Sequence, residues 1–266
     1  MKLSRFRWVL PVYLGLALVY LFLPVGLVIL FSFNDLRGRF NVRWQGFTLE
    51  HWLDPFGVPA IPRALLTSLT IAFLSALFAT ILGTLIALAL VRYRFRGREA
   101  TNISLFMPMA TPEVVLGSSL LALFVAVRVG TGFLTILIAH ILFNISYAVA
   151  TVRARIVGFD RHLEEAAMDL YADEWQTFRR VTLPMIMPGV FASFLLSFAL
   201  SFDDFVISNF TSGSLQTFPL YVWGAARRGI PAQVNVWGTV IFVVTVTVML
   251  LFLRAQRRRQ QRLGLT

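Results

Sequence analysis

Three carboxylates lie within or directly after long uncharged stretches of this chain. Glu113 interrupts one apolar stretch, and the pair Asp203 and Asp204 follows another. An ionised carboxylate at membrane depth costs at least a few kcal/mol unless it faces a water-filled cavity or a cation. No Lys or Arg within these stretches can neutralise the three groups, so a path for a cationic solute would supply their partner.

The expected depths of the three carboxylates agree with this interpretation. On ideal helices that start near Ala100 and Pro188, Glu113 lies about 20 Å along and the Asp pair about 23–24 Å along. Successive residues point about 100° apart, so we expect only one of the pair to face a central cavity. Two alternatives stay open, namely an Asp pair solvated at the outer interface and a Glu113 that complements a helix N-terminus.

The second alternative follows from the sequence before Glu113. A break after Pro108 would let a new helix begin with Thr111 as N-cap, Pro112 at the first position and Glu113 in the first turn. Broken helices at mid-membrane are also typical of transport sites.

Enzyme signatures are absent from the sequence. There is no Cys, no phosphate-binding G-x-x-x-x-G-K-[ST] pattern and no H-E-x-x-H, and the three His residues are scattered over different segments. We therefore expect no catalytic residue, no metal site and no resident cofactor, and any ATP hydrolysis must belong to a separate ATPase subunit. For His140, inside a fourth apolar stretch, we expect hydrogen bonds between packed helices, with a proton or ligand site as the alternative.

Composition places the chain in a lipid bilayer. Of 266 residues, 58% are hydrophobic and 14% are charged, and the mean hydropathy is +0.75. The sequence predicts an all-α membrane protein with six transmembrane helices in a single domain, residues 1–266. Spans of about 20 residues are needed, and six uncharged or nearly uncharged runs reach that length, at 8–33, 64–91, 100–127, 129–152, 181–202 and 230–253.

Basic residues predict the orientation of these spans. The net charge of +11 favours topology signals over nucleic acid, because the basic residues flank apolar runs. Seventeen of the 24 Lys and Arg residues fall on the side of the N-terminus, so we expect both termini and the loop 153–188 in the cytoplasm and the segment 34–63 outside. Lys2, Arg5 and Arg7 precede a run too long for a signal peptide.

Two further segments complete the outer side. In segment 34–63, Thr48 is a possible N-cap for a short interfacial helix. The stretch from Phe205 to Ala226 is too polar to face lipid, so we expect it to be re-entrant or periplasmic.

The loop 153–188 carries a spaced motif. Glu165-Ala166-Ala167 is followed after three residues by Tyr171 and after nine more by Val181-Thr182-Leu183-Pro184. This pattern resembles the EAA loop of ABC importer permeases, although Tyr171 replaces the Gly of that family. The resemblance implies a type I (MetI-like) permease whose loop is a coupling helix that docks on an ATPase. The residues expected to contribute to this coupling are Glu164, Glu165, Ala166, Ala167, Asp169, Tyr171, Leu183 and Pro184.

Three other stretches narrow the resemblance. Residues 44–52, 109–117 and 201–207 are similar to the spermidine/putrescine permeases of the PotC/PotI type. Ammonium groups on a flexible chain suit separated carboxylates and aromatic faces. The expected substrate path therefore contains Glu113, Asp203, Asp204, Trp44, Phe202 and Trp223.

The resemblance also implies an assembly in the bacterial inner membrane. It would hold a second permease subunit that is homologous but distinct, two ATP-binding cassette subunits and a periplasmic solute-binding protein. The alternatives are a permease for thiamine, an opine or ferric iron, a gradient-driven carrier or channel, and a scaffold that only recruits an ATPase.

Overall fold

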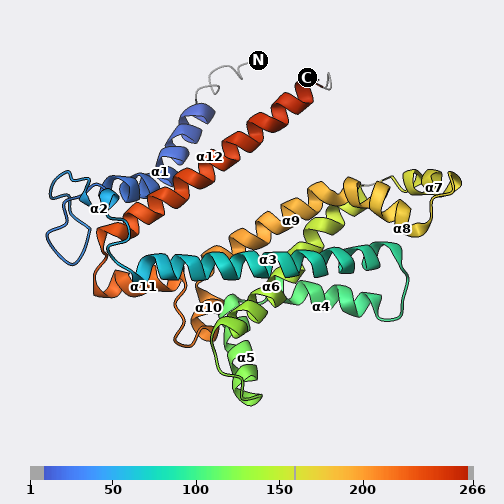
Figure 1. Cartoon of the computed structure of the whole chain (residues 1–266), viewed down its shortest axis with the longest axis horizontal. Coiled ribbons are helices and arrows are strands. Elements are labelled where there is room, and N and C mark those ends of the chain that lie inside the picture. Colours follow the sequence, from blue (N-terminus) through green and yellow to red (C-terminus); the bar gives the residue numbers. More distant parts are fainter. Residues whose placement is uncertain (1–8, 159, 263–266) are drawn as a thin grey trace. The chain divides into compact units, whose positions relative to one another are not determined.

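The computed structural model describes residues 9–158 and 160–262, and the regular structure in these ranges is helical (Figure 1). The basic residues Lys2, Arg5 and Arg7 and the first residue of the first predicted span, Trp8, lie outside the described residues. The elements are α1 (Val9–Phe31), α2 (Glu50–Leu53), α3 (Ala60–Arg92), α4 (Arg98–Ala110), α5 (Glu113–Ala126), α6 (Phe133–Val157), α7 (His162–Asp169), α8 (Glu174–Thr177), the π-helix η2 (Phe178–Thr182), α9 (Leu183–Asp203), α10 (Val206–Thr211), α11 (Phe218–Arg228) and α12 (Ala232–Arg262).

Five described helical segments are long and apolar enough to cross a membrane. A sixth span results when the bent pair α4 and α5 is counted as one. The all-helical architecture is confirmed, and the six-span count holds with one span broken. Between spans five and six, the polar stretch forms only the short helices α10 and α11.

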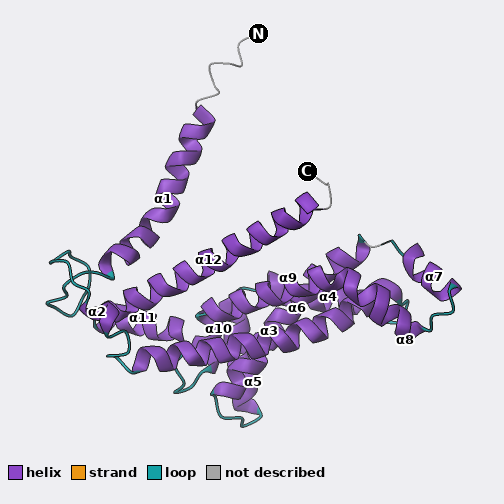
Figure 2. Cartoon of the chain, turned by 45° about the horizontal axis from the view of Figure 1, so that its top comes forward, coloured by secondary structure: helices purple, strands orange, loops and turns teal. Residues whose placement is uncertain are grey.

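The third span breaks at residues 111 and 112, where α4 and α5 meet at 109°. Both cartoon views show α5 running crosswise to α3, while α4 lies along it (Figure 2). The predicted restart of the helix is found, but the predicted N-cap is wrong. The Thr111 hydroxyl donates back to the Met107 carbonyl at 2.7 Å, and Pro112 precedes the first helical residue, Glu113.

Contacts divide the chain into two units. The first comprises Met1–Pro62 and Val222–Thr266, and the second comprises Arg63–Tyr221. Each unit is described by itself below.

In the first unit, α1 and α12 run antiparallel, with Val28 packed near Gly238. Asn34 organises the loop that follows α1. It is fully buried, donates to the Asn41 side chain at 2.6 Å and accepts from the Gln45 amide at 2.7 Å. In the same loop, the Thr48 hydroxyl accepts from the Glu50 amide at 3.1 Å, at the start of α2.

In the second unit, α3, α6 and α9 form the central bundle. Their interface uses small side chains, which let membrane helices approach closely. A Cβ atom on Gly83 of α3 would lie 2.5 Å from the Ala148 side chain of α6. A buried apolar cluster of Ala87, Leu90, Val149, Val152, Ile156 and Ile186 fixes the end of this bundle that adjoins α7.

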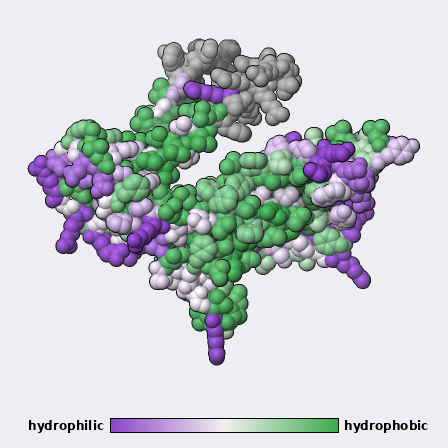
Figure 3. Space-filling model, viewed as in Figure 1, coloured by the Kyte–Doolittle hydropathy of each residue, from purple (hydrophilic) through white to green (hydrophobic). Residues whose placement is uncertain are grey.

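The surface of the second unit changes along the bundle. Figure 3 shows mostly hydrophobic residues over its long helices and hydrophilic residues gathered toward α7 and α8. The predicted cytoplasmic loop therefore lies at a polar end of the bundle.

Candidate transport and coupling sites

The two adjacent aspartates occupy different environments. Asp203 is the last residue of α9 and is exposed. At Asp204 the backbone becomes extended, with φ −62° and ψ 123°, and only 6% of its side chain is exposed. The Asp204 carboxylate turns toward α10, where it accepts from the amides of Ile207 at 3.3 Å and Ser208 at 2.8 Å.

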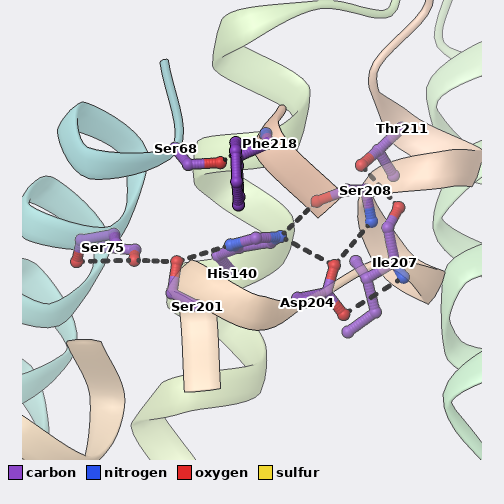
Figure 4. Close-up of polar contacts among 10 residues, drawn as sticks. Ser68, Ser75, His140, Ser201, Asp204, Ile207, Ser208, Thr211 and Phe218 are labelled. Atoms are coloured by element: carbon purple, nitrogen blue, oxygen red, sulfur yellow. Dashed lines mark hydrogen bonds and ion pairs between the residues drawn. The ribbon is translucent and has the colours of Figure 1, made fainter. Parts of the chain in front are cut away.

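His140 of α6 holds Asp204 from the other side (Figure 4). Its Nε2 lies 3.2 Å from the Asp204 carboxylate and 3.1 Å from the Ser208 hydroxyl. Its Nδ1 lies 2.6 Å from the Ser201 hydroxyl, which accepts from Ser75 of α3 at 2.8 Å. We call these five residues the His140 node. The node joins α3, α6, α9 and α10 through groups that are almost completely buried.

The prediction that His140 hydrogen-bonds between packed helices is confirmed. The sequence does not reveal this partner of Asp204, because no Lys or Arg lies in these spans and His140 lies 64 residues away along the chain. A His inside one apolar span and an Asp at the end of another are the only signal of the pair in the sequence. This arrangement leaves Asp203 as the exposed carboxylate of the pair.

Glu113 is exposed as the first residue of α5. The helix α5 packs closely on α10, because Gly117 faces Phe210, and a Cβ at Gly117 would lie 2.7 Å from that ring. The structure therefore places Glu113 on the helix that packs against the segment capped by Asp204. The contacts do not join the two carboxylates directly.

The predicted aromatic residues fall into both units. In the second unit, Phe202 is half-buried and stacks on Phe198 at 6.1 Å and on Phe218 at 6.5 Å between ring centroids. In the first unit, Trp44 is 46% exposed and Trp223 is 50% exposed. The Arg227 guanidinium lies 4.9 Å from the centroid of the Trp223 ring, which already supplies that ring with a cation.

The predicted coupling residues divide between an inner and an outer face. The helix α7 buries Glu164 alone, and that carboxylate accepts from Arg92 of α3 and from the Thr182 hydroxyl of η2. On the outer face, Ala166 and Asp169 are exposed. The Glu165 side chain is 54% exposed, with Arg161 at 3.9 Å.

The remaining predicted coupling residues lie within α7 or at the start of α9. Ala167 is half-buried. Leu183 begins α9 and packs against the buried apolar cluster of the bundle, and Pro184 follows it, exposed, in the first turn.

Tyr171 ends α7 in a strained backbone conformation. Its φ is +62° and its side chain is almost fully exposed. The Tyr171 amide donates to Met168 at 3.0 Å and the Ala172 amide to Ala167 at 3.1 Å, which is the Schellman pattern that favours Gly at this position. The EAA pattern therefore favours Gly at this position because the backbone takes a positive φ. Tyr171 adopts the same turn at a steric cost.

At the start of α7, the Asp160 carboxylate lies 2.7 Å from His162 Nδ1 and accepts from the His162 amide at 3.0 Å. The side-chain hydrogen bond with Asp160, helped by the negative charges of Asp160 and Glu165, raises the pKa of His162 above 6.5. They lower the pKa of Asp160 below 3.8, with the amide hydrogen bond contributing most.

The described part of the chain has the long apolar helices of a multi-pass membrane protein. The chain belongs to the family of binding-protein-dependent transport system inner membrane components, whose model matches residues 79–263. It is therefore a permease subunit of the ABC transporter class and a multi-pass inner-membrane protein. This family assignment removes the gradient-driven carrier and the non-transporting scaffold from consideration.

Within this class, the chain is similar to two kinds of characterised permease. It is 39% identical over 233 residues to the spermidine/putrescine transport system permease protein PotC of Haemophilus influenzae, covering 87% of this chain and 90% of that protein. It is 36% identical over 260 residues to the putrescine transport system permease protein PotI of Escherichia coli, covering 93% and 92%.

The fold is shared with a solved transporter. A crystal structure of a bacterial ABC transporter involved in the import of the acidic polysaccharide alginate matches with a TM-score of 0.66 and 16% identity, covering 97% of both chains. The type I permease architecture predicted from the loop motif is thereby confirmed.

Proposed function

We propose that this chain is the permease subunit through which an ABC importer moves polyamines such as spermidine and putrescine across the inner membrane. The observation that carries the proposal is the identity of 36–39% over most of the chain to permeases named for these solutes. The geometry adds an exposed carboxylate, Asp203, at the end of an uncharged span. An anion at this point favours a cationic solute over an anionic one.

Asp203 is the better candidate than Asp204 for direct contact with the solute. Asp204 already accepts from His140 and two backbone amides, and its side chain is buried. Phe202 and Glu113 are the other candidates in the second unit, and Trp44 and Trp223 are candidates in the first. Aromatic faces beside carboxylates suit the alternating ammonium and methylene groups of a polyamine.

The remaining machinery belongs to partner subunits. A periplasmic protein delivers the solute, a second permease completes the path, and two ATPases bind the loop helices and hydrolyse ATP. The outer side of α7 supports this docking role, because Leu163 and, directly after the helix, Leu170 are exposed apolar residues at a polar end of the bundle (Figure 3). By the positive-inside rule this end faces the cytoplasm, with both termini.

The test is ATP-dependent uptake of labelled spermidine and putrescine by proteoliposomes that contain the whole assembly. Asp203→Asn should raise the solute KM by about 10- to 100-fold, since a hydrogen bond to a charged group is worth about 1.5–3 kcal/mol. ATPase co-purification should be unchanged in this variant and lost in Glu165→Arg.

Two results would contradict the proposal. Uptake of thiamine or ferric iron without polyamine uptake would overturn the substrate class. Polyamine uptake that Asp203→Asn leaves unchanged would remove Asp203 from the path.

A further inference from the structure

Glu164 is the carboxylate of α7 that turns back into the protein. Only 7% of the residue is exposed. One of its oxygens, Oε1, accepts from both Arg92 Nη2 and Thr182 Oγ1. Arg92 also lies 3.4 Å from the Thr182 hydroxyl, so the three side chains form a closed triangle that we call the Glu164 clasp.

The clasp joins α7 and η2, which are close in sequence, to the distant end of α3. Arg92 is the last residue of α3, Thr182 is the last residue of η2, and α9 begins at the next residue, Leu183. Thr182 is completely buried, and the Arg92 side chain is 27% exposed. A buried carboxylate requires such partners, because an unpaired charge in this position is strongly unfavourable.

Among the described residues, the hydrogen-bonded pair Arg92–Glu164 links α7 to the end of α3. A cavity of about 550 Å³ lies between these elements, and Arg92, Glu164 and Thr182 are among its lining residues. Glu164 is also the one buried residue of α7. The attachment of α7 to α3 therefore depends on a few polar contacts more than on apolar packing.

The position of Thr182 adds a second indication. The five residues Phe178–Thr182 form a π-helix between α8 and α9, and π-turns inside helices frequently mark functional sites. The π-turn ends at Thr182, whose hydroxyl completes the clasp.

We propose that the Glu164 clasp is a positioning device that makes α7 move as one body with the end of α3 and the start of α9. Force that an ATPase applies to α7 then reaches two membrane helices at once. Glu164 thus acts inside the chain, while Glu165, one residue further on, belongs to the outer docking face. The inference rests on the proposed docking role of α7, and it assigns the residues that transmit that contact.

The chain has no cysteine, so a pair of introduced cysteines can be spin-labelled selectively. We would place them at His162 on α7 and Arg96 beyond α3, both exposed, in an assembly whose other subunits lack reactive cysteines. Double electron–electron resonance then measures the distance distribution with and without trapped ATP.

With the native clasp we expect a narrow distribution in both nucleotide states. Arg92→Gln and Glu164→Gln should broaden it and lower the solute imported per ATP hydrolysed by several-fold, with ATPase binding retained. The charge swap Arg92→Glu with Glu164→Arg should narrow it again. Matched controls are Arg94→Gln and Glu174→Gln, exposed residues of the same charges nearby, and these should change neither quantity.

A distribution that stays narrow in both Gln variants would overturn the proposal. If those variants fail to assemble, Thr182→Val keeps the side-chain shape and the Arg92–Glu164 pair. An unchanged distance and an unchanged transport ratio in Thr182→Val would then count against the clasp, and broadening would support it. The distance measurement needs no cargo, so an absence of polyamine uptake by the wild type would refute the substrate proposal alone.

Discussion

Asp204→Ala should lower the stability of the protein much more than Asp203→Ala. Asp204→Ala deletes the acceptor of His140 at 3.2 Å, and a hydrogen bond to a charged group contributes about 1.5–3 kcal/mol. It also removes the cap on the Ile207 and Ser208 amides, which adds about 1 kcal/mol. We expect a loss of roughly 2.5–4 kcal/mol for Asp204→Ala and a change within about 0.5 kcal/mol for the exposed Asp203→Ala.

Thermal unfolding of the purified protein in lipid nanodiscs provides the assay. A loss of roughly 2.5–4 kcal/mol corresponds to a Tm lower by roughly 5–16 °C at about this chain length. His140→Ala should cost a similar amount. The double variant with Asp204→Ala should cost at least about 1.5 kcal/mol less than the two single losses together, because they break the same contact.

If the stability losses of His140→Ala and Asp204→Ala simply added in the double variant, the proposal of a shared node would be refuted. Equal Tm values for the two aspartate variants would refute the assignment of different roles to the pair.

Three further predictions concern single positions. Tyr171→Gly should stabilise the loop by about 1 kcal/mol, because φ is +62° there, and hydrogen exchange of α7 amides should slow. Gly83→Ala should destabilise by about 1–3 kcal/mol, since its Cβ would lie 2.5 Å from a side chain of α6, while Gly26→Ala, with open space around it, should be neutral or stabilising in the same unfolding assay. Asp160→Asn should bring the pKa of His162 back toward 6.5 in an NMR titration; the contact should favour the folded loop fully below that pH and lose this effect as pH rises through the raised pKa.

The sequence was sufficient to predict the spans because lipid imposes length and apolarity on every crossing helix. The sequence indicated a break in the third span, but it did not reveal how sharply the span bends at residues 111 and 112. A Pro and a Thr indicate a break, yet the hydroxyl of Thr111 can satisfy either the new helix or the old one. It donates to Met107 of the old one.

For the sites, the sequence does not distinguish between two adjacent acidic residues. Glu164 and Glu165 are chemically almost the same, as are Asp203 and Asp204, and each pair follows from sequence only as a pair. Which member turns inward depends on Arg92 in one case and His140 in the other, both more than 60 residues away along the chain. Such partners become visible only once the helices are packed.

The His140 node and the Glu164 clasp each attach to α3, the first at Ser75 and the second at Arg92. At about 1.5 Å per residue these points lie about 25 Å apart on one continuous helix. Between them, α3 contacts α6 closely at Gly83 and through the buried apolar cluster. If a push on the loop reaches the clasp, α3 can respond by tilting about its buried attachment at Ser75, and a tilt of about 5° would move the clasp end by about 2 Å. The end of α3 near the loop would then move further than the end near the carboxylates.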